Sequence, residues 1–175
     1  MIMKFELVSL TKKDGIARVR LQRPDNRNAL SSDMIDELGA VIGEIESDSD
    51  LRVAVLEGEG KTFCAGMDLK GVRDNPTAMG GMLKGLAELS IRIRNLKIPT
   101  IARAQGAAVG GGCGLLAICD FAITHPEAKI GYPEVDLGIC PAVVAPWLIQ
   151  KIGAGKARNM LLAGGTMNGE EALAY

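Results

Sequence analysis

Residues 106–114 are Gly-Ala-Ala-Val-Gly-Gly-Gly-Cys-Gly, and this glycine loop is the stretch that decides the fold class. An apolar strand is predicted just before it, over residues 100–103, and a short buried helix just after it, over 115–118. A glycine turn between a buried strand and a helix lets the backbone approach a neighbour or a ligand closely. The order of strand, turn and helix predicts an α/β protein.

The same alternation continues from the loop toward both ends of the chain. Further strands are predicted at 5–8, 16–21, 53–56, 121–123 and 128–132, with a hairpin turn at 12–15, and helices at about 34–45, 79–93, 143–153 and 155–163. Ser31 and its neighbours cap the first of these helices. No Pro-rich, Ser-rich or like-charged block separates two halves, so we expect one domain over residues 1–175.

Charge and hydropathy exclude several classes of function. Lys and Arg number 20 and Asp and Glu number 21, which gives a net charge of -1. This balance provides no bulk attraction to nucleic acid or to an anionic membrane. No apolar run reaches the roughly 18 residues of a membrane-spanning helix, and the first residues do not form a signal peptide. We therefore expect a cytoplasmic protein.

The cysteines and the single histidine limit the available chemistry. Cys64, Cys113, Cys119 and Cys140 form no Cys-x-x-Cys pair, and three of them lie in apolar or glycine-rich stretches, so we expect small buried residues rather than disulfides or zinc ligands. With His125 alone, a Ser-His nucleophile or a multi-histidine metal site is not expected. His125 lies in a predicted turn, where a lone histidine is more often a hydrogen-bonded surface residue than a general base.

Two turns offer backbone N–H groups to a ligand, one over residues 65–70 and one over 110–112. We expect each to follow a buried strand and to open a helix, where free amides carry partial positive charge. Two such amides on one carbonyl oxygen form an oxyanion hole, which stabilises an enolate by about 3 kcal/mol or more. The alternative is that the glycines only permit close packing of helix on strand.

Such a hole needs an acid beside it, and Glu134 is the candidate. Pro133 stiffens the segment before it, and its neighbours in sequence are mostly apolar. A partly buried carboxyl with a raised pKa suits proton transfer at carbon. The alternative is a solvated loop acid. We do not expect Asp136, two residues farther along, to replace Glu134.

Four collinear stretches of the chain resemble the enoyl-CoA hydratase/isomerase (crotonase) family. They are residues 23–30, 63–69, 106–114 with 119–120, and 132–134 with 138–141. The resemblance implies a ClpP-like spiral of repeated ββα units that binds acyl-CoA thioesters. It implies coenzyme A as part of the substrate, no permanently bound cofactor or metal, and assembly as a homotrimer or hexamer.

Carried over by position, the resemblance also implies roles for individual residues. The amides of Met67 and Gly111 would form the oxyanion hole, and Glu134 would move protons at the acyl carbons. The implied substrate-binding residues, which would lie along coenzyme A or its thioester arm, are Ala65, Met67, Asp68, Leu69, Lys70 and Gly111. Lys70 could also meet a phosphate.

Position 114 departs from the family's two-glutamate hydratases, because Gly114 stands where they carry a second catalytic acid. One glutamate suffices for a 1,3-proton shift, whereas a typical hydratase holds its water between two carboxylates. Isomerisation therefore fits these residues better, although Gly114-Leu115 and residues 141–146 resemble a bacterial subgroup placed with methylglutaconyl-CoA-type hydratases. The sequence predicts an enzyme that hydrates or isomerises an enoyl-CoA. The alternative is a non-catalytic CoA-thioester-binding or assembly subunit.

The last residues predict a helix that starts after Asn168 and stops at Tyr175 after about a turn. Members of the family continue with helices that cover the acyl pocket and build the trimer. We therefore expect a chain truncated at its C-terminus, without the C-terminal helical part, and such a fragment could lack activity.

Overall fold

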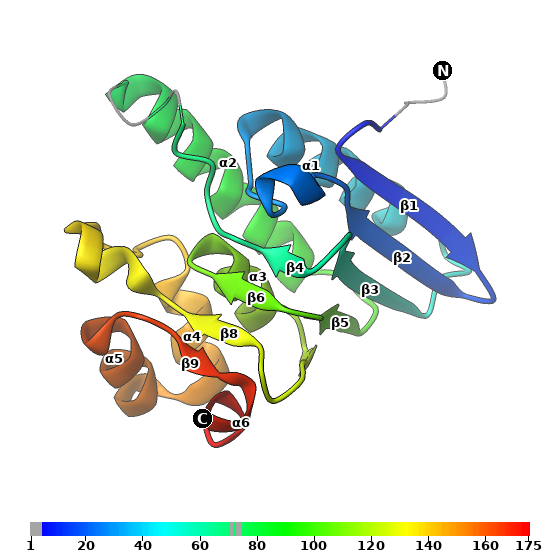
Figure 1. The fold of residues 1–175 in the computed structure, drawn as a ribbon. Coiled ribbons are helices and arrows are strands. Elements are labelled where there is room, and N and C mark those ends of the chain that lie inside the picture. The colour runs from blue at the N-terminus through cyan, green and yellow to red at the C-terminus, as the bar shows by residue number, and fades with distance from the viewer. Residues whose placement is uncertain (1–4, 71, 73–74) are drawn as a thin grey trace.

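The computed structural model describes residues 5–70, 72 and 75–175, which form two β-sheets flanked by helices (Figure 1). The first sheet has the order β1 (Val8–Lys13), β2 (Ile16–Leu21), β3 (Val53–Gly58), β5 (Thr100–Arg103) and β7 (Phe121–Ile123). The second has the order β4 (Thr62–Cys64), β6 (Ala107–Val109), β8 (Lys129–Gly131) and β9 (Met167–Asn168). The β1–β2 and β8–β9 pairs are antiparallel, and the other pairs are parallel.

Six α-helices and two 3-10 helices lie in the described residues. They are η1 (Pro24–Asn26), α1 (Ser32–Glu46), α2 (Pro76–Arg94), α3 (Gly111–Ile118), η2 (Pro133–Leu137), α4 (Ala145–Ile152), α5 (Ala154–Ala163) and α6 (Gly169–Leu173). None of these α-helices is long and apolar enough to cross a lipid bilayer.

The chain repeats one unit of two strands and a helix. In β3, β4 and α2, and again in β5, β6 and α3, the first strand joins the first sheet, the second strand joins the second sheet, and the helix leads back. The strands β7 and β8 with α4 form the next unit. Because parallel neighbours need a crossover connection, the repetition winds the chain as a spiral. The predicted α/β class and the implied ββα repeat are confirmed.

Helix α1 shows how the sequence directs the packing. The Ser31 hydroxyl accepts a hydrogen bond from the Met34 N–H at 3.3 Å, so the predicted cap is confirmed. The residues that α1 buries are Met34, Ile35, Leu38, Val41, Ile42 and Ile45. This spacing places one apolar face of α1 in the core.

The first strand begins later than predicted, because residues 6–8 are held by α1. The Glu37 carboxylate accepts hydrogen bonds from the N–H groups of Glu6, Leu7 and Val8 at 2.8 to 3.1 Å. Strand β1 then runs to Lys13, and the turn shrinks to two residues with φ of 52° and 76°. The prediction of a strand over 5–8 was therefore wrong.

Two other local predictions were also wrong. Residues 106–114 are not a continuous loop, because they contain strand β6 and the first turn of α3. The turn at 65–70 does not open a helix: Met67 forms a parallel β-bridge with Leu30, and α2 begins later, capped by Asn75. Pairing with a segment distant in the sequence takes precedence here over the local glycine signal.

Candidate active site

The N-terminus of α3 is fixed against two strands of the second sheet. Gly110 precedes the helix with φ of 56°, and its N–H donates to the carbonyl oxygen of Gly131 in β8 at 2.9 Å. A Cβ on Gly112 would overlap the carbonyl oxygen of Cys64 in β4, so only glycine allows this contact. The start of α3 is thereby held between β4 and β8.

The turn that contains Met67 lies directly against this helix start. The Leu30 N–H donates to the Gly66 carbonyl oxygen at 2.8 Å, and the Asp68 N–H donates to the Leu30 carbonyl oxygen at 2.8 Å. A Cβ built on Gly66 would be 3.4 Å from the Gly111 nitrogen, and one built on Gly111 would be 3.6 Å from Met67 Cγ. The two predicted turns therefore lie in contact.

The amides of Met67 and Gly111 differ from their neighbours. The N–H groups of Ala65, Asp68 and Gly110 donate to carbonyl oxygens, whereas within the described residues those of Met67 and Gly111 donate to no protein acceptor. The first N–H groups of a helix have no partner inside that helix and lie at its positive end. This holds for Gly111, which begins α3, whereas the Met67 amide lies in a turn paired with Leu30. Two adjacent amides without a protein acceptor suit a ligand oxygen that gains negative charge.

Glu134 lies beside the same turn. It belongs to η2 rather than to the extended segment predicted, and its Oε1 is 2.7 Å from the position that a Cβ on Gly110 would take. Its Oε2 is buried and has no hydrogen-bond partner among the described residues. Burial raises the pKa of the Glu134 carboxyl above its ordinary value. The structure thus brings the acid to the glycine turn, with one oxygen unpaired.

The Asp68 side chain forms an ion pair with Arg23. Arg23 Nη2 lies 3.0 Å from Asp68 Oδ2, and Arg23 Nη1 donates to the Ala29 carbonyl oxygen at 2.6 Å. The two side chains are only 18% and 15% exposed. This ion pair fixes the Met67 turn to η1, a role for Arg23 that the sequence analysis missed because its partner lies far along the chain.

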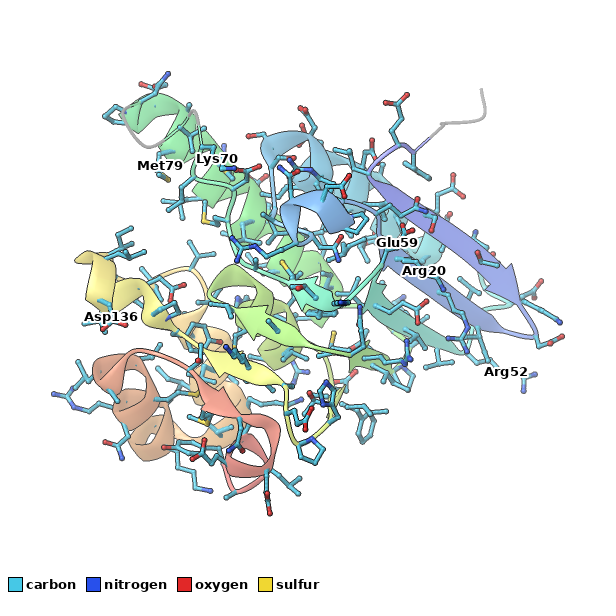
Figure 2. All side chains as sticks on the ribbon, in the orientation of Figure 1. Arg20, Arg52, Glu59, Lys70, Met79 and Asp136 are labelled. Carbon is cyan, nitrogen blue, oxygen red and sulfur yellow. The ribbon has the colours of Figure 1, made fainter. Side chains whose placement is uncertain are left out.

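The other implied binding residues around this turn have different surroundings. The Ala65 N–H donates to the Arg27 carbonyl oxygen at 3.0 Å, so its backbone belongs to the scaffold. Leu69 is half-buried, and Lys70 is exposed on the segment between β4 and α2, where Figure 2 labels it. Lys70 is the cationic residue of the 65–70 turn, and its exposure leaves its side chain accessible to a ligand in solvent.

Asp136 and His125 lie in other environments. Asp136 Oδ2 accepts a hydrogen bond from the Gly165 N–H at 3.1 Å, at the end of α5. The segment is a 3-10 helix rather than an extended one, and Asp136 interacts at Gly165, whereas Glu134 lies at Gly110. His125 is exposed, and its Nε2 lies 2.9 Å from the Gln105 carbonyl oxygen, as expected for a hydrogen-bonded surface residue.

The cysteines match their predicted state. Cys64, Cys113 and Cys119 are buried, Cys140 is exposed, and all four are free. Burial raises the pKa of each of the three buried thiols to about 12. These thiols therefore remain protonated at neutral pH and are poor nucleophiles.

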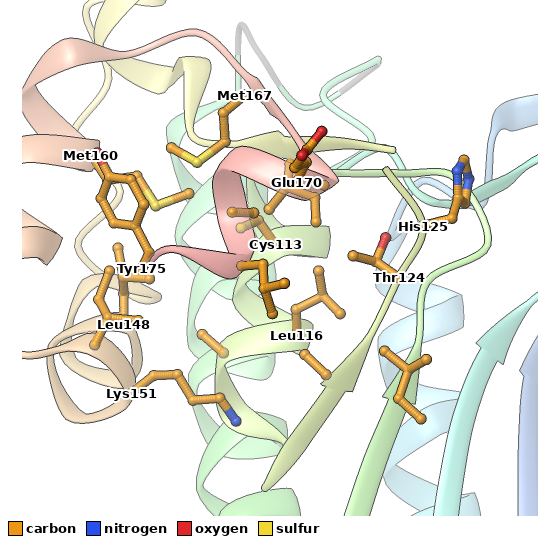
Figure 3. Close-up of a pocket in the computed structure, with 18 of the residues that line it drawn as sticks. Cys113, Leu116, Thr124, His125, Leu148, Lys151, Met160, Met167, Glu170 and Tyr175 are labelled. Carbon is orange, nitrogen blue, oxygen red and sulfur yellow. The ribbon is translucent and has the colours of Figure 1, made fainter. Parts of the chain in front are cut away.

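A cavity of about 710 Å³ lies elsewhere, between β7, β8 and helices α3 to α6 (Figure 3). Its labelled lining residues include Cys113, Leu116, Leu148, Met160 and Met167. None of the predicted site residues lines it. Few polar groups converge on this space, so it lacks the arrangement that carbonyl chemistry requires.

Comparison with known proteins gives consistent matches. The sequence model of the enoyl-CoA hydratase/isomerase family matches residues 11–175. A short-chain-enoyl-CoA hydratase of Clostridium acetobutylicum is 36% identical over 98% of this chain and 67% of its own length. A crotonyl-CoA hydratase of Syntrophomonas wolfei is 31% identical over 97% of this chain and 66% of its own length.

Comparison with solved structures also matches the chain to proteins of similar fold. The structure of Pseudomonas aeruginosa AtuE superposes with a TM-score of 0.92 at 36% identity, covering 97% of this chain and 67% of that one. The chain thus spans about two thirds of the length of the relatives it matches.

Proposed function

Because the chain belongs to the enoyl-CoA hydratase/isomerase family, we propose that it hydrates or isomerises an enoyl-CoA through a thioester enolate. The observation that carries this proposal is the contact between the Met67 and Gly111 turns, with the Glu134 carboxyl beside Gly110. The thioester oxygen accepts hydrogen bonds from the Met67 and Gly111 amides. These bonds strengthen as negative charge develops on the oxygen, which lowers the barrier.

In isomerisation, the Glu134 carboxylate removes a proton from the carbon between the thioester carbonyl and the double bond. The C–H electron pair forms the enolate double bond, and the carbonyl oxygen takes the negative charge. When the carbonyl re-forms, the double bond moves next to it, and the former alkene carbon farther from the thioester takes the proton from Glu134. One acid returns to its starting state, and no co-reactant is consumed.

In hydration, the same residues add water to a double bond that is already conjugated with the carbonyl. Glu134 accepts a proton from the attacking water, and the oxygen adds to the carbon farther from the thioester. The enolate then takes that proton back from Glu134 at the nearer carbon. The burial that raises the pKa of Glu134 suits both steps, because the group must both accept and donate a proton.

Coenzyme A enters as part of the substrate in this proposal. Lys70, exposed beside the Met67 turn, is placed to meet one of its phosphates. No permanently bound cofactor is needed for either reaction, and the active assembly is a homotrimer or hexamer.

The direct test is turnover of crotonyl-CoA and of a 3-enoyl-CoA by the protein and by Glu134→Gln. General acid–base catalysis contributes about 10²- to 10⁴-fold, so we expect kcat/KM to fall by that factor. Asp136→Asn is the matched control, because it also neutralises an acid of η2 but one that bonds to Gly165. Turnover that survives in Glu134→Gln would exclude Glu134 as the proton carrier.

Gly114 keeps a second function open, that of a CoA-thioester binder without turnover. Calorimetry with crotonyl-CoA and acetyl-CoA distinguishes the two. Binding without reaction of any enoyl-CoA, unchanged in Glu134→Gln, would favour the binder.

A further inference from the structure

Two glycines one helical turn apart on α3 leave space for two side chains from other segments. The Gly114 N–H donates to the Gly110 carbonyl oxygen at 2.9 Å, which places both positions on one face of α3. The Glu134 carboxyl fills the space at Gly110. Val144 fills the space at Gly114, where an added Cβ would overlap Val144 Cγ1 and lie 2.9 Å from Val144 Cβ.

Space alone requires glycine at position 114. Gly114 lies inside α3 and has no positive φ, so any L-residue could adopt its backbone conformation. A helical side chain leans toward the helix N-terminus, so a side chain at 114 would point toward Gly110 and its neighbour Glu134. Val144 thus occupies the space into which a polar side chain from α3 would otherwise extend.

Val144 is firmly placed. It is 4% exposed, its N–H donates to the Pro141 carbonyl oxygen at 3.2 Å, and its carbonyl oxygen accepts from the Leu148 N–H at 3.2 Å at the start of α4. A buried water needs two to four polar partners (about three on average), and the isopropyl group of Val144 supplies none. The space at Gly114, one helical turn from the Gly110 position that Glu134 fills, is therefore occupied by hydrocarbon.

We propose that Val144 is a specificity-determining residue, which excludes water and a second polar group from the α3 side of Glu134 and so favours a proton shift between substrate carbons over addition of water. This inference rests on the proposed function and selects isomerisation over hydration as the main reaction. Val144 packs on Gly114, whereas the atoms nearest to a Cβ at Gly111 belong to Leu30, Met67 and Leu86. It acts through the surroundings of Glu134.

The test measures how the enzyme divides its activity between two reactions. The rate of isomerisation of a 3-enoyl-CoA and the rate of hydration of crotonyl-CoA are measured for the protein, for Val144→Gly and for Val144→Thr. Val144→Gly opens the space, and Val144→Thr places a hydroxyl there without leaving a cavity. In both variants we expect the ratio of hydration to isomerisation to rise about tenfold, equivalent to about 1.4 kcal/mol between the two barriers.

Val41→Ala is the control for lost packing. Val41 is fully buried in α1, so its truncation also removes methyl groups from the core. Its effect on stability should resemble that of Val144→Gly in sign, and its ratio of hydration to isomerisation should stay at the value of the unmodified protein. A merely structural role for Val144 would move the two rates together.

Replacement of Gly114 sharpens the test. In Gly114→Glu, the new side chain meets Val144, and we expect lower stability with no gain in hydration. In the double variant Gly114→Glu/Val144→Gly, the space is open, and we expect the hydration rate to exceed that of Val144→Gly.

The outcomes separate the two proposals. An unchanged ratio in Val144→Gly and Val144→Thr, with isomerisation still lost in Glu134→Gln, would overturn the role of Val144 and leave the proposed function intact. Absence of both reactions in the unmodified protein would overturn both.

Discussion

The N-terminus of α3 and the cavity of about 710 Å³ differ in the chemical groups that they present to a ligand. Within the described part of the chain, the first has two amides without a protein acceptor and one half-buried acid, packed so closely that glycine is required at Gly66, Gly110 and Gly112. The second has volume and an apolar lining. Carbonyl chemistry needs convergent polar groups, so the difference teaches that close backbone contacts, rather than the size of a cavity, mark the site proposed for the reaction.

The largest expected effect tests the close contact of α3 with β4. Gly112→Ala places a Cβ on the Cys64 carbonyl oxygen and 2.8 Å from Cys64 Cβ, so α3 must move. We expect the free energy of unfolding to fall by about 3 kcal/mol in urea denaturation.

Gly80→Ala in α2 is the matched control. Nothing lies within 4 Å of a Cβ at Gly80, so this change should stabilise the protein by about 0.5 to 1 kcal/mol through helix propensity. If both variants changed stability equally, the close packing at the site would not distinguish it from the rest of the chain.

The next effect concerns the ion pair that holds the Met67 turn. Asp68→Asn removes the charge beside Arg23, whose side chain is mostly buried. We expect a loss of about 1 to 3 kcal/mol in the free energy of unfolding, together with weaker binding of crotonyl-CoA.

Glu88→Gln breaks the exposed Lys84–Glu88 pair of α2 and serves as the comparison. Its expected cost is below about 0.5 kcal/mol. An Asp68→Asn variant as stable as Glu88→Gln would show that the turn is held by its backbone bonds to Leu30 alone.

The pH dependence of stability tests the burial of Glu134. Its pKa is raised above 4.5 by burial, so the folded state disfavours the charged form. Above the folded pKa, the buried charge costs stability that Glu134→Gln does not incur. Below 4.5 the carboxyl is protonated in both states, and the cost disappears.

We therefore expect Glu134→Gln to be more stable than the unmodified protein at neutral pH, with the difference shrinking as the pH falls. Urea denaturation from pH 4 to 8 (about four units around the affected range) measures it. A variant that is less stable at neutral pH would indicate a stabilising partner for the carboxylate.

The smallest effect is expected in the cavity. Ile123 is 55% exposed on β7 and lines this space. Ile123→Ser should change the free energy of unfolding by less than about 0.5 kcal/mol, and the KM for crotonyl-CoA should stay within about twofold. A KM raised tenfold or more would show that the cavity holds part of the substrate and would remove the distinction between the two regions.

Local signals predicted the parts of the fold that depend on local physics. The cap at Ser31 and the apolar spacing of α1 predicted that helix, and residues 100–103 and 121–123 were predicted as the strands that β5 and β7 form. Strand β1 was misplaced because the Glu37 carboxylate, from another element, binds the amides before it.

The candidate site was predictable only in its residue types. Glycine turns and a lone acid can be recognised in the sequence, and the structure brings Met67, Gly111 and Glu134 together. The pairing of Met67 with Leu30 and the packing of Val144 on Gly114 join residues about 30 positions or more apart. No local pattern encodes such contacts, because each depends on how the spiral stacks one unit on the next.

The hydrogen bond from Gly110 to Gly131 couples the two halves of the site mechanically. Glu134 follows β8 after only two residues, so a thermal displacement of β8 carries the acid and the α3 turn in the same direction. The Met67 turn is tethered to Leu30 and Arg23, and it follows β4, on which α3 packs through Gly112. In the proposed reaction, a thioester arm that enters beside α3 therefore meets an acid whose register with the helix is fixed by the backbone.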